Sequence, residues 1–432
     1  MSVATDSVFA GLGQRGTGDV LVVAEGEPDL TVGELLAACD HPVLALDDGW
    51  HGADAALTTA STRRALLAMA GLEGRAGRVL LAGASGSPAL LPGARAVPDD
   101  AVGAPAAAPR ATGAVRTRWV FATSGTSGSP KLVTHTSASL TRATARLPGA
   151  RWGLLYDWHR FAGTQVVLAA VAGGGTVLVP AHARLEDRVG FLTRNRCDHL
   201  SATPSLWRRL LMVPGAAELP LRQATLGGEI ADDRTLAAVA ARFPGARVSH
   251  VYASTEAGAA FAVHDGRAGF PEGFLTDPPR GIALEVRGSR LHVANALVEP
   301  AYAGSGVRFV DDRGFVDTGD DVELRGGRFH FLGRSSGALN VGGTTFHPER
   351  VEEFLDSLPE VAHARVRGRA SSVLGQIVVA EVVPAPGADR SSLAAEVRRR
   401  CRASLPAAMV PGKVLLVDEL PLDASGKVAR RD

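Results

Sequence analysis

The stretch around which the chain is organised, residues 119–131, reads Trp-Val-Phe-Ala-Thr-Ser-Gly-Thr-Ser-Gly-Ser-Pro-Lys. Its apolar start, Trp119 to Ala122, predicts a buried strand. The glycines that follow let backbone N–H groups approach an anion closely, the hydroxyl groups add donors, and the lysine adds a positive charge. The stretch therefore predicts a phosphate-binding loop, with a polar surface turn as the alternative. The candidate ligands are Thr123, Ser124, Gly125, Thr126, Ser127, Gly128 and Lys131.

Lysine is rare in this chain, which favours a role in a site for the lysine of the loop. Of 46 basic residues, only Lys131, Lys413 and Lys427 are lysines, so arginine serves wherever a generic positive charge is enough. Lysine carries a compact point charge in place of the planar fork of arginine. Lys131 closes the glycine-containing loop and Lys427 directly follows Gly426, which makes these two lysines candidate phosphate-binding residues.

The composition indicates a globular protein with balanced charge. The 432 residues are enough for two domains, and 46% of them are hydrophobic. A net charge of +1 argues against a nucleic-acid or membrane-surface partner. The three cysteines are far apart, as expected for free thiols in a reducing compartment, and the N-terminus lacks the features of a signal peptide. We therefore expect a cytoplasmic location.

One uncharged run, residues 161–181, is as long as a membrane-spanning helix. Three consecutive glycines at 173–175 interrupt it, and Thr-Val-Leu-Val-Pro follows them. The run therefore predicts a buried helix, a turn and a short buried strand in place of a membrane span.

Strands and helices alternate along most of the chain, which is the pattern of an α/β fold with doubly wound, mainly parallel sheets. We expect strands at 20–23 and 42–46, and a helix that opens with the capping-box spacing of Thr31-Val-Gly-Glu34. Short alternating segments separated by turns at 284–332 predict a small antiparallel β unit.

The same pattern predicts two domains. The N-terminal domain spans 1–334 and consists of a subdomain at 1–97, a flexible low-complexity connector at 98–116 and a core at 117–334. Residues 335–432 show an α+β pattern and form a smaller C-terminal domain.

Further polar stretches follow apolar runs, as the phosphate-binding loop does. Ligands of doubly wound folds collect at the carboxyl ends of strands, so polar residues there are candidate ligands. Each stretch alone is a weak signal, because a segment such as Thr-Gly-Asp is most often only a turn. The stretches are Leu226-Gly-Gly-Glu229, Val251-Tyr-Ala-Ser-Thr-Glu-Ala-Gly258, Val316-Asp-Thr-Gly-Asp320, Gly333-Arg-Ser-Ser-Gly-Ala-Leu-Asn-Val-Gly-Gly343 and Leu420-Pro-Leu-Asp-Ala-Ser-Gly-Lys427.

Taken in this order and at these spacings, the stretches resemble the motifs of the adenylate-forming superfamily. This superfamily comprises acyl- and aryl-CoA synthetases, peptide-synthetase adenylation domains and luciferases. The resemblance covers the chain from residue 117 to its end. The matching segments are 123–131 (the family's Thr-Ser-Gly-Thr-Thr-Gly-x-Pro-Lys), 252–256 (Tyr-Gly-x-Thr-Glu), 318–320 (Thr-Gly-Asp), 333–343 (the Gly-Arg hinge region) and 426–427 (the terminal Gly-Lys).

The resemblance implies a reaction and its cofactors. Members of the family join a carboxylate to ATP in the presence of Mg²⁺, which gives acyl-AMP and pyrophosphate, and then transfer the acyl group. Carboxylates are poor electrophiles, and AMP supplies the leaving group that they lack. The implied acceptor is CoA, because Asn340-Val-Gly-Gly343 followed by Phe346-His-Pro-Glu-Arg-Val-Glu looks more like CoA synthetases than peptide-synthetase modules.

The resemblance also implies ligands for the nucleoside end of ATP. Tyr252 would stack on adenine, and Gly227–Gly228 would let the backbone approach closely, with Glu229 beside them. Asp320 would accept hydrogen bonds from the ribose hydroxyls, with Arg334 next to it.

At the phosphate end, the loop at 123–131 would hold the β- and γ-phosphates, and Thr255 would contact the α-phosphate. Glu256 would ligate Mg²⁺, a hard cation that prefers oxygen. Lys427 would bridge the carboxylate and the α-phosphate and stabilise the charge that develops there.

Between the half-reactions, the family's C-terminal domain swings about its hinge. Lys427 then leaves, and the face around Asn340, Gly342 and Gly343 enters, where small residues leave room for a pantetheine arm. The hinge position, which usually carries Asp or Lys, corresponds to Ser336 in this chain.

In the family, the acyl pocket lies between the segment at 156–163 and the strand end before Tyr252. Aromatic side chains in this segment favour a ring-bearing or small acid over a long chain. Asp157 resembles the carboxylate that holds an α-amino group in amino-acid-activating relatives, with a solvated turn residue as the alternative. The candidate pocket residues are Asp157, Trp158, His159, Phe161, Gly163, Ala253 and Ser254.

Three functions follow from the sequence. The first is an AMP-forming acid ligase that passes its acyl group to CoA. The second keeps the adenylation but uses a carrier-protein thiol, an amine or a small inorganic nucleophile as acceptor, which the short region before the phosphate-binding loop leaves open. The third is a nucleotide-binding protein without turnover, against which the retained Lys131, Glu256, Asp320 and Lys427 argue.

Overall fold

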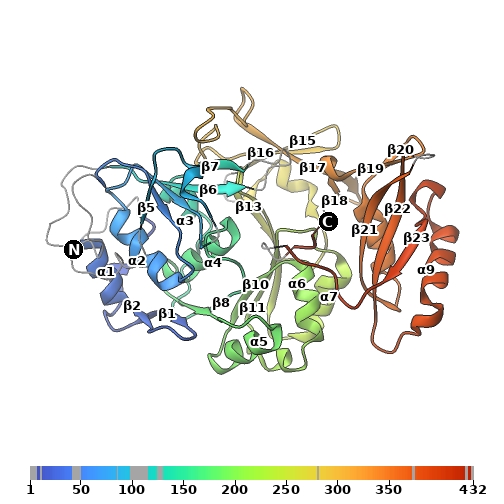
Figure 1. Cartoon of the computed structure of the whole chain (residues 1–432), viewed down its shortest axis with the longest axis horizontal. Helices are drawn as coiled ribbons and strands as arrows, with labels where there is room; N and C mark the ends of the chain where they lie inside the picture. The colour runs from blue at the N-terminus through green and yellow to red at the C-terminus, as the bar shows by residue number, and fades with distance from the viewer. Residues whose placement is uncertain are drawn as a thin grey trace.

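The computed structural model of the chain describes residues 7–9, 12–40, 50–84, 86–97, 115–123, 130–279, 282–371, 375–423 and 427–429. A large N-terminal domain and a smaller C-terminal domain lie side by side (Figure 1). The strand expected at 42–46 and nearly all of the connector expected at 98–116 lie outside the described residues.

The larger sheet of the N-terminal domain has the strand order β13-β12-β11-β10-β8-β9-β1-β2. Its inner strands pair in parallel, and only the edge strands β13 and β2 pair antiparallel to their neighbours. This arrangement confirms the mainly parallel, doubly wound sheet. The strands are β1 (Val20–Ala24), β2 (Leu30–Thr31), β8 (Arg151–Leu154), β9 (Thr176–Val179), β10 (His199–Ala202), β11 (Gln223–Gly227), β12 (Arg247–Ser254) and β13 (Gly258–Val263).

A second sheet, ordered β5-β3-β4-β6-β7, contains the strand from which the sequence interpretation began. Trp119 and Val120 are fully buried in β6, as their apolar run predicts. The next strand in the chain, β7, pairs antiparallel with β6. The strands are β3 (Ala55–Leu57), β4 (Arg78–Leu81), β5 (Arg95–Val97), β6 (Arg118–Thr123) and β7 (Lys131–His135).

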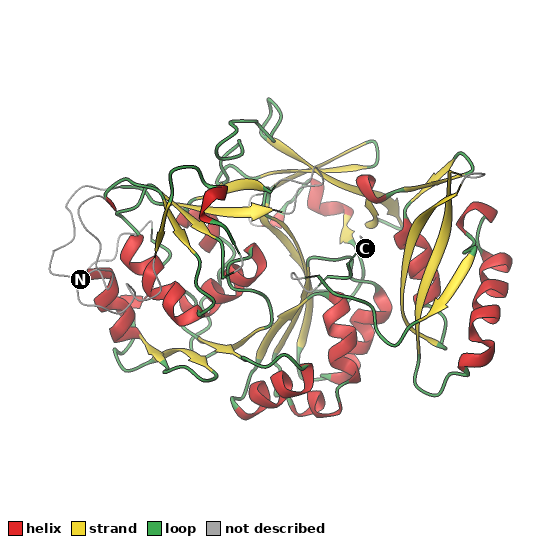
Figure 2. Cartoon of the chain, in the orientation of Figure 1, coloured by secondary structure: helices red, strands yellow, loops and turns green. Residues whose placement is uncertain are grey.

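Helices flank both sheets (Figure 2). The capping box at the start of α1 is present: the N–H of Thr31 donates to Glu34 over 2.9 Å, and the N–H of Glu34 donates to the Thr31 hydroxyl over 3.3 Å. The uncharged run at 161–181 folds as α4, a glycine turn and β9, as predicted. The helices are α1 (Val32–Asp40), α2 (Thr62–Leu72), α3 (Ser137–Thr141), α4 (Phe161–Val171), α5 (Leu185–Arg194), α6 (Pro204–Met212) and α7 (Asp233–Arg242). Among the described residues, none of the helices combines the length and the apolar character that crossing a bilayer requires.

The small β unit expected at 284–332 is an antiparallel sheet with the order β14-β18-β17-β16-β15. Its core includes the buried rings of Phe270 and Phe329. The strands are β14 (Phe270–Pro271), β15 (Ala283–Arg287), β16 (Arg290–Ala294), β17 (Phe315–Arg325) and β18 (Arg328–Arg334).

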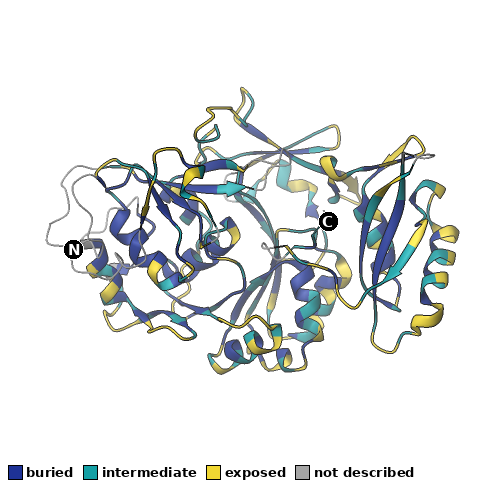
Figure 3. Ribbon diagram, in the orientation of Figure 1, coloured by how far each residue is buried: buried dark blue, intermediate teal, exposed yellow. Residues whose placement is uncertain are grey.

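The C-terminal domain combines a sheet ordered β21-β22-β23 with two helices and a hairpin. Most of β22 and the middle of β21 are buried, while one side of α9 is exposed (Figure 3). This is the predicted α+β pattern. The elements are β19 (Leu339–Val341), β20 (Thr344–Phe346), α8 (Pro348–Asp356), β21 (Val361–Ser371), β22 (Gly375–Pro384), α9 (Arg390–Ser404) and β23 (Lys413–Leu416).

After β23 the chain returns to the N-terminal domain as a short hairpin. Leu422 and Val428 form an antiparallel bridge, and Leu422 also packs against the apolar core around α6 and α7. In Figure 1 this dark red segment runs back from the C-terminal domain toward α6 and α7. The end of the chain is therefore held by both domains.

Candidate active site

Hairpin pairing between β6 and β7 brings the two ends of the phosphate-binding loop together. Thr123 is the register partner of Lys131, so the residues that flank the loop lie side by side at the end of a two-stranded ribbon. The loop residues Ser124, Gly125, Thr126, Ser127 and Gly128 lie outside the described residues.

Tyr302 links two of the candidate residues, a role that the sequence did not reveal. The Nζ atom of Lys131 lies 5.0 Å from the centroid of the Tyr302 ring, a cation–π distance. The Tyr302 hydroxyl hydrogen-bonds to the Glu256 carboxylate; burial and the charge of this carboxylate raise the pKa of Tyr302. The N–H of Ala303 donates to the carbonyl of Leu132 over 2.8 Å, which fixes the Tyr302 segment beside β7.

His135 positions the backbone next to Glu256. Its Nε2 lies 2.8 Å from the carbonyl oxygen of Thr255, and its Nδ1 lies 2.7 Å from the hydroxyl of Ser139. A carbonyl can only accept, so Nε2 carries the proton and Nδ1 accepts from the serine. Burial lowers the pKa of His135 to about 4, so the ring is neutral near pH 7. The sequence analysis did not assign this histidine.

Tyr252 stacks on two phenylalanine rings from other strands. Its ring centroid is 5.2 Å from that of Phe261 and 5.1 Å from that of Phe331, with interplanar angles of 18° and 12°. These contacts fix the orientation of the Tyr252 ring, and stacking of adenine on it stays a prediction of the resemblance. The Tyr252 hydroxyl donates to Asp320 over 2.5 Å. Burial and the charge of Asp320 raise the pKa of Tyr252, so it keeps this proton.

Asp320 and Arg334 are register partners on β17 and β18. The Nε of Arg334 donates to Asp320 over 3.2 Å, and its Nη2 donates to the carbonyl of Thr318 over 2.9 Å. A Thr-Gly-Asp segment is most often a turn, but Asp320 lies within β17. There Gly319 has a φ of +76°, and the register shifts between Asp321 and Val322, as at a β-bulge.

Lys427 reaches the glycine pair at the end of β11 from the C-terminal hairpin. A Cβ atom at Gly228 would lie 3.1 Å from the Cε of Lys427 and 3.8 Å from its Nζ. Gly228 also has a φ of +84°, a conformation that favours glycine. The glycine therefore leaves room for the lysine side chain, although the two residues are about two hundred positions apart in sequence.

Glu229 fixes this arrangement through both of its carboxylate oxygens. Its Oε1 accepts the N–H of Val428 over 2.8 Å, and its Oε2 accepts the N–H of Ser205, in the first turn of α6, over 2.9 Å. In this arrangement the carboxylate binds backbone groups of the protein, which is a role that the sequence analysis did not give it.

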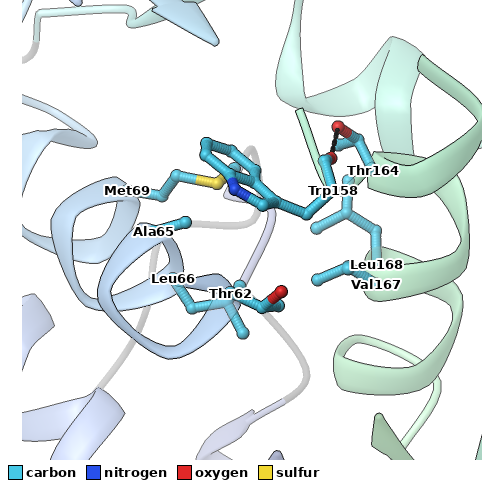
Figure 4. Close-up of a pocket in the computed structure, with 8 residues that line it drawn as sticks. All are labelled: Thr62, Ala65, Leu66, Met69, Trp158, Thr164, Val167 and Leu168. Carbon is cyan, nitrogen blue, oxygen red and sulfur yellow. Dashed lines mark hydrogen bonds between the residues drawn. The ribbon is translucent and has the colours of Figure 1, made fainter. Parts of the chain in front are cut away.

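The residues predicted for the acyl pocket have different surroundings. Trp158 is buried and donates its indole N–H to the carbonyl of Thr59 over 3.0 Å, and its ring lies between α2 and α4 (Figure 4). His159 lies against Gly83, where a Cβ would be 2.2 Å from the imidazole; burial lowers the pKa of this histidine. The predicted aromatic slot therefore does not include Trp158, which packs in the core.

Three other residues of the same segment have clear local roles. Phe161 packs on His135, with ring centroids 5.0 Å apart. Gly163 cannot carry a side chain, because a Cβ would lie 2.1 Å from the carbonyl oxygen of Asp157. The Asp157 carboxylate itself is 49% exposed and lies 3.6 Å from Arg160, which fits a solvated turn residue. On the adjoining strand β12, Ala253 packs against the apolar core.

Gly342 and Gly343 form the turn between β19 and β20, and Asn340 lies in β19 just before it. Both glycines have positive φ, +57° and +84°, as in the tight turns that favour hairpins. The side chain of Asn340 accepts the N–H of Gly343 over 3.2 Å. The turn belongs to the C-terminal domain, and in this conformation Lys427 is the residue of that region beside Gly228.

The charges of these residues suit a magnesium-bound triphosphate. Lys131, Arg334 and Lys427 supply positive charge, and Glu256 supplies the carboxylate oxygen that Mg²⁺ prefers when phosphates complete its ligands. Asp320 supplies an acceptor for hydroxyl groups.

Comparisons with known proteins indicate the family of the chain. A family model described as "AMP-binding enzyme" matches residues 56–298, and one described as "AMP-binding enzyme C-terminal domain" matches residues 350–427. An isonitrile lipopeptide synthase of Streptomyces coeruleorubidus is 29% identical over 72% of this chain and 23% of its own length. A 4-chlorobenzoate–CoA ligase of Pseudomonas sp. (strain CBS-3) is 29% identical over 72% of this chain and 64% of its own.

Solved structures share the fold. ATP-bound MatB from Rhodopseudomonas palustris superposes with a TM-score of 0.78 over 98% of this chain and 97% of that chain, at 20% identity. The chain spans 23% of the length of the lipopeptide synthase, so it corresponds to only a part of that protein. Because the first family model covers more than half of the residues, the chain belongs to the AMP-binding enzyme family.

Proposed function

We propose that this protein is an ATP-dependent acid ligase that activates a carboxylic acid as acyl-AMP, releases pyrophosphate and then transfers the acyl group, with CoA as the acceptor. The observation that carries the proposal is the contact between Lys427 and Gly228, held by the hydrogen bond from Val428 to Glu229. This contact brings the lysine of the C-terminal Gly-Lys motif to the glycine pair at the end of β11. Ligands of parallel sheets bind at such strand ends.

The described residues would divide the work as follows. Lys131 would hold the terminal phosphates, and Lys427 would stabilise the charge at the α-phosphorus. Asp320 would bind the ribose hydroxyls, with Tyr252 and Arg334 holding its carboxylate in place. When bound, Mg²⁺ would neutralise phosphate charge, with Glu256 as its protein ligand.

In the first half-reaction, a carboxylate oxygen of the acid forms a bond to the α-phosphorus, and the bond between this phosphorus and the bridging oxygen of pyrophosphate breaks. Charge builds up on the phosphoryl oxygens in the transition state, and a lysine held in place stabilises it without reorganisation. In the second half-reaction, the sulfur of a thiol that has lost its proton attacks the acyl carbon, and AMP leaves.

A carrier-protein thiol is the second candidate acceptor. The chain is 29% identical to a lipopeptide synthase and spans 23% of that protein's length. The remainder of such a protein has room for a carrier segment, which favours a carrier-protein thiol. An amine or a small inorganic nucleophile would need no thiol.

The acid that we propose is aromatic or small, with His159 as the remaining aromatic candidate of 156–163, since Trp158 and Phe161 pack in the core. The Asp157 carboxylate is exposed and lies beside Arg160, so it is not a buried group that could hold an α-amino group. This disfavours amino acids as substrates.

A screen of carboxylic acids for pyrophosphate release, with and without CoA, tests the proposal. We expect release with one chemical class of acid, and an acyl-CoA product by mass spectrometry when CoA is present. Release without any CoA-dependent product would point to another acceptor, and no release with any acid would contradict the proposed function.

A further inference from the structure

Arg208, on α6, lies at the boundary between the two domains and contacts both. On the N-terminal side, its Nε donates to the Thr235 hydroxyl over 2.9 Å, and its Nη2 pairs with Asp232, the residue that caps α7. On the C-terminal side, the same Nη2 lies 3.2 Å from Asp356, and Nη1 lies 3.0 Å from the nearer ring nitrogen of His363. One guanidinium group therefore joins α6 and α7 to α8 and β21.

This ionic contact is shielded from water, so it is stronger than a surface pair. The side chains of Arg208 and Asp356 are 17% and 10% exposed. Burial works against the charge of the guanidinium, but the carboxylates of Asp356 and Asp232 outweigh it and raise the pKa of Arg208. Truncation of one partner in a buried, hydrogen-bonded charge pair is costly because the other charge is left unpaired.

The helix that carries Arg208 also carries the contact that holds Lys427. Ser205, which donates its N–H to Glu229, precedes Arg208 by three residues, so the two lie on the same side of α6. The Oε1 of Glu229 in turn accepts the N–H of Val428, the neighbour of Lys427. The C-terminal domain, through Arg208, and the hairpin that carries Lys427, through Glu229, are therefore both attached to α6.

We propose that Arg208 is a positioning residue for the adenylation half-reaction, which it serves by holding the C-terminal domain in the orientation that keeps Lys427 beside Gly228. The inference rests on the proposed function. A cavity of ≈ 160 Å³ lies at the same boundary, so this part of the contact is incompletely packed. Charged side chains (Arg208, Asp232, Arg234 and Asp356) and apolar ones (Leu211, Met212, Ala238 and Ala362) line it together. An incompletely packed contact loses little buried surface when it opens, so the two domains can separate here, as transfer of the acyl group to an acceptor would require.

The test uses Arg208→Met, which keeps the apolar stem, and Asp356→Asn, which keeps an acceptor for the N–H of Ala364. Each variant is assayed for acid-dependent pyrophosphate release and for acyl transfer from supplied acyl-AMP. Hydrogen exchange at the amide of Val428 is measured without substrates. We expect pyrophosphate release to fall on the order of tenfold or more while acyl transfer is retained, and Val428 to exchange faster.

The double variant should be little worse than either single variant, because both remove the same contact. Arg209→Met is the matched control. Arg209 neighbours Arg208 on α6 and pairs with Glu419 over 3.0 Å, but the two side chains are 40% and 72% exposed. Exposed pairs contribute little, so we expect less than about a fivefold change.

An equal loss in both half-reactions, or unchanged exchange at Val428, would overturn the inference. If Arg208→Met fails to fold, Asp356→Asn tests the same contact from the C-terminal side. If the wild-type protein releases no pyrophosphate with any acid, the proposed function fails, and the exchange measurement still decides whether Arg208 holds the C-terminal hairpin.

Discussion

The backbone N–H of Val428 donates to Oε1 of Glu229 over 2.8 Å and so joins the end of the C-terminal region to the loop after β11. The other oxygen of the same carboxylate accepts the N–H of Ser205 at the start of α6. These hydrogen bonds hold Lys427 against Gly228. Among the described residues, its ammonium group forms no ion pair with a carboxylate. A lysine presented in this way is suited to a phosphate.

Lys427→Ala should abolish most adenylation while sparing the transfer step. Loss of one preorganised charge at a transition state costs on the order of 10²–10³ in rate. We therefore expect this loss in acid-dependent pyrophosphate release, with thioester formation from supplied acyl-AMP retained. Lys413→Ala, at an exposed lysine in β23, is the control and should leave both steps unchanged. Equal losses in both steps of Lys427→Ala would contradict the assigned role.

Glu229→Gln should weaken the attachment of the C-terminal hairpin. A carboxylate offers two acceptor oxygens, whereas an amide offers one oxygen and an NH₂ group that cannot accept. Either Ser205 or Val428 then loses its partner, and we expect unfolding free energy to fall by about 1 kcal/mol. If the lost partner is Val428, adenylation falls as well, and the amide of Val428 exchanges faster. Unchanged denaturant midpoint and unchanged exchange would contradict this account.

Asp320→Asn should act on ATP binding. Hydrogen bonds to a charged group contribute about 1.5–3 kcal/mol, so we expect KM for ATP to rise on the order of 10- to 100-fold, with a smaller change in kcat. Asp317→Asn is the control, because Asp317 lies on the same strand but is 56% exposed and pairs with Arg290. A fall in kcat at unchanged KM would show that Asp320 does not bind the ribose.

His135 should make stability depend on pH. Its pKa is lowered from 6.5 to about 4 by burial, so between these values the unfolded chain binds a proton that the folded protein excludes. The free energy of unfolding is therefore fully retained above pH 6.5 and falls by about 3 kcal/mol as the pH drops to 4.

The control for this prediction is His135→Gln, which keeps an N–H donor for the carbonyl of Thr255 but does not titrate. Urea denaturation at pH 7, 5 and 4 should show a weaker pH dependence for the variant. Parallel curves for the two proteins would show that His135 titrates normally.

The sequence predicted much of the fold because the relevant signals are local. The capping box at Thr31 and Glu34, the buried strand at Trp119 and the glycine interruption at 173–175 each depend on neighbouring residues, and the structure confirms all three.

The contacts around the site were less predictable because they join distant residues. Nothing in the local sequence distinguishes Arg208 from the other arginines, since its partner Asp356 lies on another domain. The rings that stack on Tyr252 come from β13 and β18, and Trp158 turns toward α2 because an apolar core is available there. Packing between segments far apart in the chain determines these roles.

The most direct test of the central claim is the exchange of labelled pyrophosphate into ATP in the absence of any acceptor. This exchange reports the reversible formation of acyl-AMP alone and is independent of whether CoA or a carrier protein follows. The account predicts that label enters ATP only when Mg²⁺ and a carboxylic acid of one chemical class are present, and that Lys427→Ala prevents this. Folded protein that binds ATP but shows no exchange with any acid would contradict it.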